Sequence, residues 1–229
     1  MFSPSGAAGL RQGRHARPAR PDLSGVLSPS RGADRPVVRK AVMSSKSAKI
    51  LLTGLPGCGK TTALMETIEK LNCKKVAGFY TQEIREAGSR KGFSWTRLDG
   101  TSGILAHVDI KGRFKVGKYG VDVAGFEESV VPVLDIEQND AELFVIDEIG
   151  KMECLSGKFV AAARRLFSSD RSVLATVAQK GGGLISEVKQ IAGVGLFSLT
   201  RQNRDKTIAE ILQILSFLKE PSAGRRPAD

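Results

Sequence analysis

The chain has 229 residues, of which 41% are hydrophobic and 26% are charged, the composition of an ordinary globular protein. Its three cysteines are scattered and odd in number, which excludes a disulfide framework, and no apolar run approaches the roughly 18 residues of a membrane-spanning helix. Of the formal net charge of +11, most falls on residues 1–46, which hold nine basic and two acidic residues. The rest is only mildly basic, so nucleic acid is a possible but disfavoured partner.

Residues 1–46 are rich in Arg, Pro, Ser, Gly and Ala and show no sustained hydrophobic period, so we expect them to be disordered. They fit an organellar transit segment, a basic tail without a targeting function, or a translation artefact upstream of a true start codon at Met43. We expect one α/β domain over 47–219 and a second disordered tail over 220–229. Scattered, unpaired cysteines favour an intracellular reducing compartment. This would be the cytoplasm, or an organelle if residues 1–46 are a transit segment.

The first predicted strand, 48–53, leads through a glycine-rich loop into a predicted helix over 60–71. The loop reads GLPGCGKT, which is the G-x-x-x-x-G-K-[ST] pattern of a P-loop, and it has the strand–loop–helix context that this motif requires. Lys60 can reach the β- and γ-phosphates, and the Thr61 hydroxyl can ligate Mg²⁺. The residues expected to bind nucleotide phosphate are Gly54, Leu55, Pro56, Gly57, Cys58, Gly59, Lys60, Thr61 and Thr62.

A second strand is predicted over 76–81, after which the chain changes character across 83–126. Glycines there separate short alternating stretches, which predict antiparallel hairpins appended to the main sheet. The three stretches are 92–98, 103–108 and 119–123. A helix is predicted over 126–140, with Pro132 in its first turns, where early N–H groups lack partners and proline is tolerated.

The apolar strand predicted over 142–147 ends in two acids, which is a Walker B pattern. Asp147 would hold the Mg²⁺ ion. Glu148, one residue further, can orient or deprotonate a water on the γ-phosphate, which favours hydrolysis. Two solvated acids at a strand end are the ordinary alternative. The P-loop upstream argues against it, because sheets of this kind bind ligands at the carboxyl ends of their strands.

The remaining chain alternates helices and strands, which predicts a parallel sheet with helices on both faces. The expected elements are a helix over 156–168, a strand over 172–177, a helix over 184–191, a strand over 195–199 and a helix over 204–219. Phosphoryl transfer often needs an additional cation. The candidates are Lys151, Arg201 and Arg204. For Arg204 the ordinary alternative is that it begins the last helix with Asp205, behind Asn203 as the N-cap.

Four motifs in this order make the chain similar to the cancer-related nucleoside-triphosphatase family, which occurs from thermophilic prokaryotes to animals. They are GLPGCGKTT at 54–62, GFYT at 78–81, FVIDEIGKME at 144–153 and TRQNRD at 200–205. The resemblance covers 47–219 and is most specific in the IDEIGKME run. It implies a RecA-like P-loop fold and slow, Mg²⁺-dependent hydrolysis of nucleoside triphosphates with loose base selectivity. It gives Lys60, Thr61, Asp147 and Glu148 the roles described above.

The sequence therefore predicts an α/β fold of the RecA-like P-loop NTPase type, with a mostly parallel sheet flanked by helices and an antiparallel hairpin insert. The predicted function is a nucleoside-triphosphatase that hydrolyses ATP, GTP and other triphosphates with Mg²⁺, using Glu148 and Lys60 as catalytic residues. The alternatives are a nucleotide or polynucleotide kinase with the same P-loop and a non-enzymatic nucleotide switch or nucleic-acid binder. No N-K-x-D motif follows the late strands, so recognition specific to GTP is not expected. We expect a monomer without membrane contact.

Overall fold

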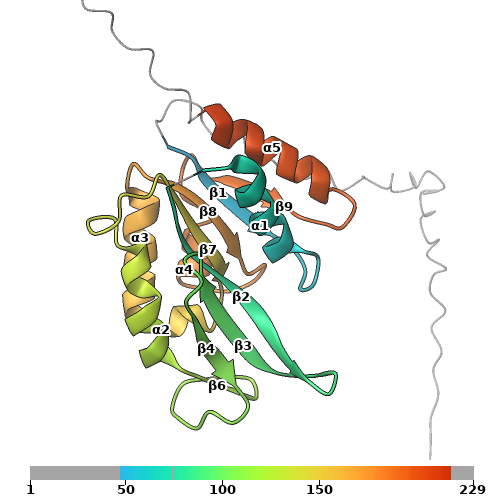
Figure 1. Cartoon of the computed structure of the whole chain (residues 1–229), viewed down its shortest axis with the longest axis vertical. Coiled ribbons are helices and arrows are strands. Elements are labelled where there is room, and N and C mark those ends of the chain that lie inside the picture. The colour runs from blue at the N-terminus through green and yellow to red at the C-terminus, as the bar shows by residue number, and fades with distance from the viewer. Residues whose placement is uncertain (1–46, 74, 218–229) are drawn as a thin grey trace, which may run out of the picture. The chain divides into compact units, whose positions relative to one another are not determined.

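The computed structural model describes residues 47–73 and 75–217, so the tails expected at 1–46 and 220–229 lie outside the described residues (Figure 1). The described strands form one nine-stranded sheet in the order β5-β6-β4-β3-β2-β7-β8-β1-β9. In chain order they are β1 (Lys49–Thr53), β2 (Val76–Glu86), β3 (Ser89–Arg97), β4 (Ser102–His107), β5 (Lys115–Val116), β6 (Tyr119–Val121), β7 (Leu143–Ile149), β8 (Ser172–Val177) and β9 (Gly195–Ser198). The helices are α1 (Lys60–Leu71), α2 (Val123–Ser129), the 3-10 turns η1 (Val131–Leu134) and η2 (Glu153–Leu155), α3 (Gly157–Ser168), α4 (Leu184–Glu187) and α5 (Arg204–Phe217).

Strands β2, β7, β8, β1 and β9 are parallel neighbours, which confirms the predicted α/β core. The three inner strands β7, β8 and β1 are almost continuously apolar because helices cover both faces of the sheet. Figure 1 shows α1 and α5 on one face and α2 and α3 on the other. All five strands point the same way, so the loops after β1, β7 and β8 open at one edge of the sheet.

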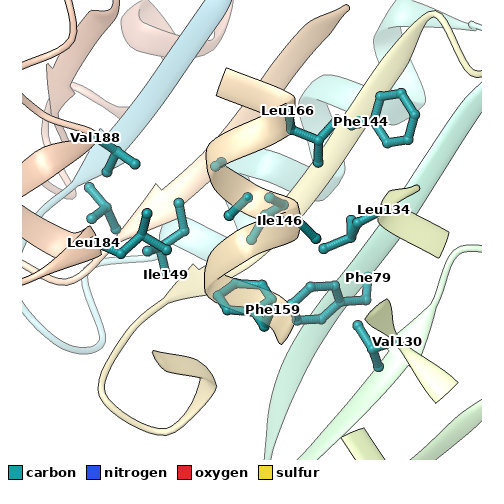
Figure 2. Close-up of a cluster of buried hydrophobic side chains, with 14 of the residues drawn as sticks. Phe79, Val130, Leu134, Phe144, Ile146, Ile149, Phe159, Leu166, Leu184 and Val188 are labelled. Atoms are coloured by element: carbon teal, nitrogen blue, oxygen red, sulfur yellow. The ribbon is translucent and has the colours of Figure 1, made fainter. Parts of the chain in front are cut away.

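Each face of the sheet buries its own apolar cluster. Under α1 and α5, Leu52 of β1 packs with Leu64 and Ile211. On the other face, the rings of Phe79, Phe126 and Phe159 meet at centroid distances of 5.5, 6.2 and 5.6 Å. Figure 2 shows Phe79 and Phe159 packed together beside the strand residue Ile146. These contacts pack β7 between the two layers of helices, and β7 carries the predicted acids.

The hairpin insert is confirmed, and it continues the same sheet. Strand β2 runs five residues beyond the predicted end, to Glu86, and pairs antiparallel with β3. The two-residue turn between them, Ala87 and Gly88, has positive φ values of 46° and 78°, which suit the twist of a tight hairpin. Strand β3 then pairs with β4, β4 with β6, and β6 with β5. The parallel strands and the insert are therefore one sheet joined through β2.

The helix predicted over 126–140 is wrong. Helix α2 begins earlier, because the Asp122 side chain accepts a hydrogen bond from Gly125 N at 2.9 Å and caps the helix. It ends at Ser129, since Pro132 lacks an N–H donor and its ring clashes with the carbonyl four residues before it. Pro132 instead lies at the start of η1.

The helix predicted over 184–191 is only partly formed. The α-helical part, α4, ends at Glu187, and Gln190 N then bonds the Glu187 carbonyl three residues back at 3.0 Å. This tighter spacing is that of a 3-10 turn. The predictions for the first helix and for the strand over 172–177 are confirmed at both ends. None of the described helices combines the length and the apolar character that crossing a bilayer requires.

Candidate active site

The loop between β1 and α1 has a backbone shape that its glycines require. Gly57 and Gly59 have φ values of 72° and 96°, a region that favours glycine. At Gly54 an added Cβ would stand 2.5 Å from the carbonyl oxygen of Leu199. Helix α1 begins at Lys60, and its first N–H groups have no partner within the helix. Such N–H groups, together with the helix dipole, give this loop the chemistry that suits anionic phosphate.

The carboxylate of Asp147 is buried at the end of β7, with 1% of the residue exposed. The Thr61 hydroxyl donates to its Oδ2 at 2.7 Å, and the Thr176 hydroxyl donates to its Oδ1 at 2.6 Å. The backbone N–H of Thr81 also donates to Oδ2, at 3.4 Å. Burial raises the pKa of Asp147, and these hydrogen bonds and the charge of Lys60 oppose the rise. The structure thus brings Thr61 and Asp147, the two predicted metal ligands, into direct contact.

Two residues that contact this carboxylate, Thr81 and Thr176, were not among the predicted site residues. Strands β7 and β8 pair Ile146 with Ala175, so the next residue of each strand is Asp147 and Thr176. A hydroxyl at the end of the apolar run SVLATV, at the edge where such sheets bind ligands, is the signal that would have indicated Thr176. Thr81 contributes its backbone N–H, which every residue type except proline carries.

The charges of Glu148, Lys60 and Asp147 act on one another at this end of β7. Burial raises the pKa of Glu148, the charge of Lys60 opposes the rise, and Asp147 adds to it. The Lys60 ammonium donates to the Gly54 carbonyl at 3.4 Å. Glu148 is therefore a carboxylate of increased basicity placed beside the buried acid and the loop lysine.

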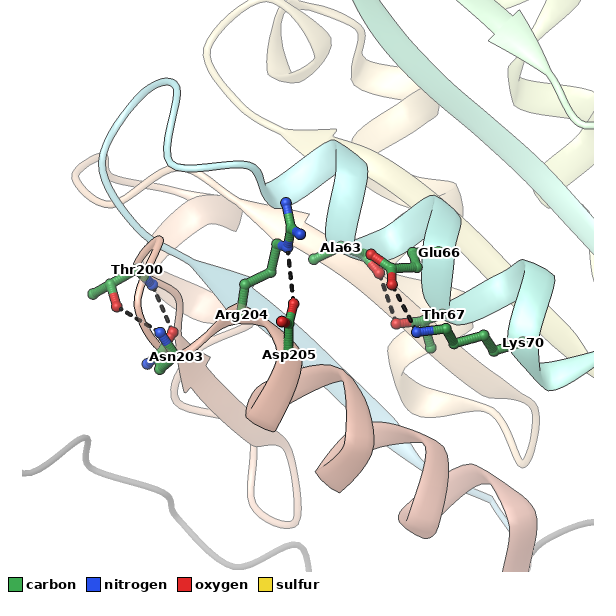
Figure 3. A network of polar contacts seen from close by, with 8 residues as sticks. All are labelled: Ala63, Glu66, Thr67, Lys70, Thr200, Asn203, Arg204 and Asp205. Carbon is green, nitrogen blue, oxygen red and sulfur yellow. Dashed lines mark hydrogen bonds and ion pairs between the residues drawn. The ribbon is translucent and has the colours of Figure 1, made fainter.

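The three candidate cations differ in position. The Cδ atom of Arg204 lies 3.8 Å from where a Cβ on Gly59 would stand, so this side chain lies against the P-loop. Its Nε pairs with the Asp205 carboxylate at 3.3 Å, and Figure 3 shows the side chain extending toward the start of α1. Lys151 and Arg201 are exposed, and neither makes an ion pair within the described part of the chain.

Asn203 occupies the N-cap position of α5, because its carbonyl accepts the helical bond from Thr207 N at 2.9 Å. Its side chain serves a different purpose. The Asn203 Oδ1 accepts from Thr200 N at 2.8 Å, and its Nδ2 donates to the Ser198 carbonyl at 2.9 Å. Figure 3 shows this closed turn beside Arg204. The turn fixes the start of α5, and with it the origin of the Arg204 side chain.

The oxygen atoms of Thr61 and Asp147 suit Mg²⁺, a hard cation that is usually held by one or two carboxylates together with substrate phosphates. In the described ranges 47–73 and 75–217, no group of three or more His, Cys, Asp and Glu side chains forms a separate metal centre. A hydroxyl and a carboxylate already in contact are the partial ligand set that this kind of site uses. The remaining ligands would come from phosphate and water.

Comparisons with known proteins match most of the described chain. A family model described as NTPase matches residues 49–212. The nucleoside-triphosphatase THEP1 of Thermotoga petrophila is 43% identical over 171 residues, which are 74% of this chain and 93% of that protein. The human cancer-related nucleoside-triphosphatase is 36% identical over 178 residues, which are 71% of this chain and 94% of that protein. The crystal structure of THEP1 from Aquifex aeolicus superposes with a TM-score of 0.67 at 35% identity, over 75% of this chain and 99% of that one.

Proposed function

The chain belongs to the NTPase family matched over residues 49–212, and on that premise we propose that it hydrolyses nucleoside triphosphates to the diphosphate and phosphate. The observation that carries the proposal is the 2.7 Å hydrogen bond between Thr61 of the P-loop and Asp147 of β7, with Glu148 as the next residue. This bond joins the phosphate-binding loop to the end of the strand that carries the proposed base. All the proposed site residues lie within the single domain predicted over 47–219.

In the proposed mechanism the P-loop N–H groups and Lys60 bind the phosphates. Thr61 and Asp147 would hold Mg²⁺, which would supply positive charge to neutralise the phosphates. Glu148 accepts a proton from the water that attacks the γ-phosphorus, and the bond to the bridging oxygen of the diphosphate breaks. The basicity of Glu148 that burial produces supports this role, because a general base works best when its pKa lies near the working pH.

Arg204 is the proposed cation that stabilises the charge on the transferring phosphoryl group. Its position beside Gly59 supports this choice over Lys151 and Arg201. We propose that ATP, GTP and other triphosphates all serve as substrates. Every group assigned a role acts on phosphate, water or the ion, and none of them acts on the base.

The experiment compares the full chain with Glu148→Gln, and with Glu142→Gln as a matched control just before the start of β7. Phosphate release is measured for the common triphosphates with and without Mg²⁺. We expect Glu148→Gln to lower release about 100-fold or more while Mg·ATP binding stays, because the amide cannot accept the proton. The control should release phosphate at the rate of the unaltered chain. Full activity of Glu148→Gln would refute the assignment of the base.

A parallel assay separates hydrolysis from phosphotransfer. The chain is incubated with γ-labelled ATP and with RNA, DNA or nucleosides as acceptors. Hydrolysis predicts that the label appears as free phosphate at the same rate whether or not an acceptor is present. Stoichiometric transfer of the label to an acceptor hydroxyl would establish the kinase alternative in its place.

A further inference from the structure

The turn that follows β7 contains a second buried acid that the proposed mechanism does not use. Glu153 begins η2 and is 5% exposed. Within the described residues its carboxylate makes no ion pair with a lysine or arginine. Burying an ionised carboxylate without such a partner is costly. The free-energy cost of burying Glu153 must therefore be offset, either by a change in its protonation or by other interactions.

Glu153 lies beside the proposed base. A Cβ added to Gly150 would stand 2.8 Å from Glu153 Oε2 and 3.3 Å from Glu148 Oε1. Both carboxyl groups therefore lie against the same glycine, one from the end of β7 and the other from η2. The lack of a side chain at Gly150 leaves room for both.

The charges around Glu153 are mostly negative. Burial raises the pKa of Glu153 to about 8, and the charges of Glu148 and Asp147 add to the rise. Backbone hydrogen bonds from Gly150 and from Glu153 itself oppose it. On η2 the neighbouring thiol is Cys154, whose pKa burial and Glu153 raise to about 11. Near neutral pH, Glu153 therefore keeps its proton.

No cation from the adjoining helix compensates Glu153. Helix α3 also packs against η2, and it carries Lys158, Arg164 and Arg165, the last of which is exposed and makes no ion pair within the described residues. Lys158 pairs with Glu127 at 3.1 Å, and Arg164 pairs with Glu187 at 2.9 Å. The carboxyl of Glu153 is thus neutral near pH 7, buried and placed against the turn that leads from the proposed base.

We propose that Glu153 is a positioning residue for hydrolysis: its carboxyl packs over Gly150, braces the turn after β7 and so holds the Glu148 carboxylate toward the attacking water. This inference rests on the proposed function, because it needs Glu148 as the base. A neutral partner suits this task. A second anion over Gly150 would repel the Glu148 carboxylate that it has to hold in place.

The test measures kcat and KM for Mg·ATP in the full chain, in Glu153→Leu and in Glu153→Gln, from about pH 6 to about pH 9. We expect Glu153→Leu to lower kcat by about 10- to 100-fold and KM much less, since a misplaced base costs rate and not binding. Glu153→Gln should restore most of that loss, because the amide keeps the shape and the neutral charge. Above pH 8 the unaltered chain should lose activity as Glu153 ionises, and Glu153→Gln should lack that loss. Glu127→Gln, on α2, is the matched control and should keep the pH profile of the unaltered chain.

Three results would overturn the inference: an unimpaired Glu153→Leu, a Glu153→Gln as slow as Glu153→Leu, or an alkaline loss that persists in Glu153→Gln. If Glu153→Leu does not fold, as judged by circular dichroism and binding of Mg·ATP, the pH profile of Glu153→Gln alone decides. Glu148→Gln is assayed alongside. Full activity in Glu148→Gln refutes Glu148 as the base and with it the role of Glu153, whereas an unaltered chain that releases no phosphate refutes the proposed function. An inactive Glu148→Gln with an unimpaired Glu153→Leu refutes only the role of Glu153.

Discussion

The buried carboxyl of Glu153 should make the stability of the fold depend on pH, and Glu153→Gln should remove that dependence. Its pKa rises from 4.5 in the unfolded chain to about 8 in the folded protein. Between these values the folded state binds more protons than the unfolded state, so stability falls as the pH rises. The stabilisation that this proton contributes is fully present below pH 4.5. It is lost progressively as the pH rises, and the loss is complete above about pH 8. A glutamine carries no such proton and has no such loss.

The size of the effect follows from the shift. Each pKa unit corresponds to about 1.4 kcal/mol, so the rise from 4.5 to about 8 amounts to about 5 kcal/mol between the two ends of the range. Glu153 is buried, so solvent screening takes little from this figure. A domain of this size is typically stable by about 5–15 kcal/mol, which makes the expected change a large part of the total.

The assay is urea unfolding of the full chain and of Glu153→Gln, without Mg²⁺ or nucleotide, at intervals between about pH 5 and about pH 9. The free energy of unfolding of the variant minus that of the unaltered chain should grow by several kcal/mol up to pH 8 and then level off. Glu127→Gln is the control. The hydrogen bond from Ser156 and the charge of Lys158 lower the pKa of Glu127, so this variant should show no such growth.

Parallel stability curves for the unaltered chain and Glu153→Gln would refute the reasoning. So would a curve in which the unaltered chain gains stability relative to the variant as the pH rises. Either result would mean that Glu153 is ionised in the folded protein at neutral pH. The kinetic and the thermodynamic tests of Glu153 therefore report on the same proton through independent readouts.

Three further predictions concern the rest of the site and the sheet. Thr176→Val removes a 2.6 Å hydrogen bond to the proposed metal-binding carboxylate, and a Mg²⁺ titration of hydrolysis should show about 10- to 100-fold weaker apparent metal affinity. Arg204→Ala should lower kcat about 100-fold or more with a smaller change in KM. Arg204→Lys should recover little of this loss, because an ammonium lacks the planar guanidinium fork. An unimpaired kcat in Arg204→Ala would remove Arg204 from the mechanism. Gly78→Ala would place a Cβ 1.9 Å from the Val145 carbonyl oxygen, so urea unfolding should show a loss of about 3 kcal/mol or more, whereas Gly100→Ala, which has open space and a φ of 93°, should lose less.

Much of the parallel half of the sheet could be predicted from the sequence. The first strand, the P-loop and α1 form one continuous segment. The backbone geometry of such a segment depends on residues close in sequence, so the spacing of its glycines and apolar residues was enough to predict it. The Asp147 and Glu148 pair was predictable for the same reason, because both acids end an apolar strand. The helix expected over 126–140 failed where two local signals competed, an N-cap at Asp122 and a break at Pro132.

Only the tertiary structure decided which distant groups meet at the site. Asp147 receives its hydrogen bonds from Thr61, Thr81 and Thr176, which lie 86, 66 and 29 residues away along the chain. These contacts depend on strand order, and strand order is decided by the packing of the whole sheet. The sequence by itself determined a phosphate-binding loop and two acids at a strand end. The fold decided that Thr176 bonds to the first acid, that Glu153 and the second acid lie against Gly150, and that the Arg204 side chain lies against the loop.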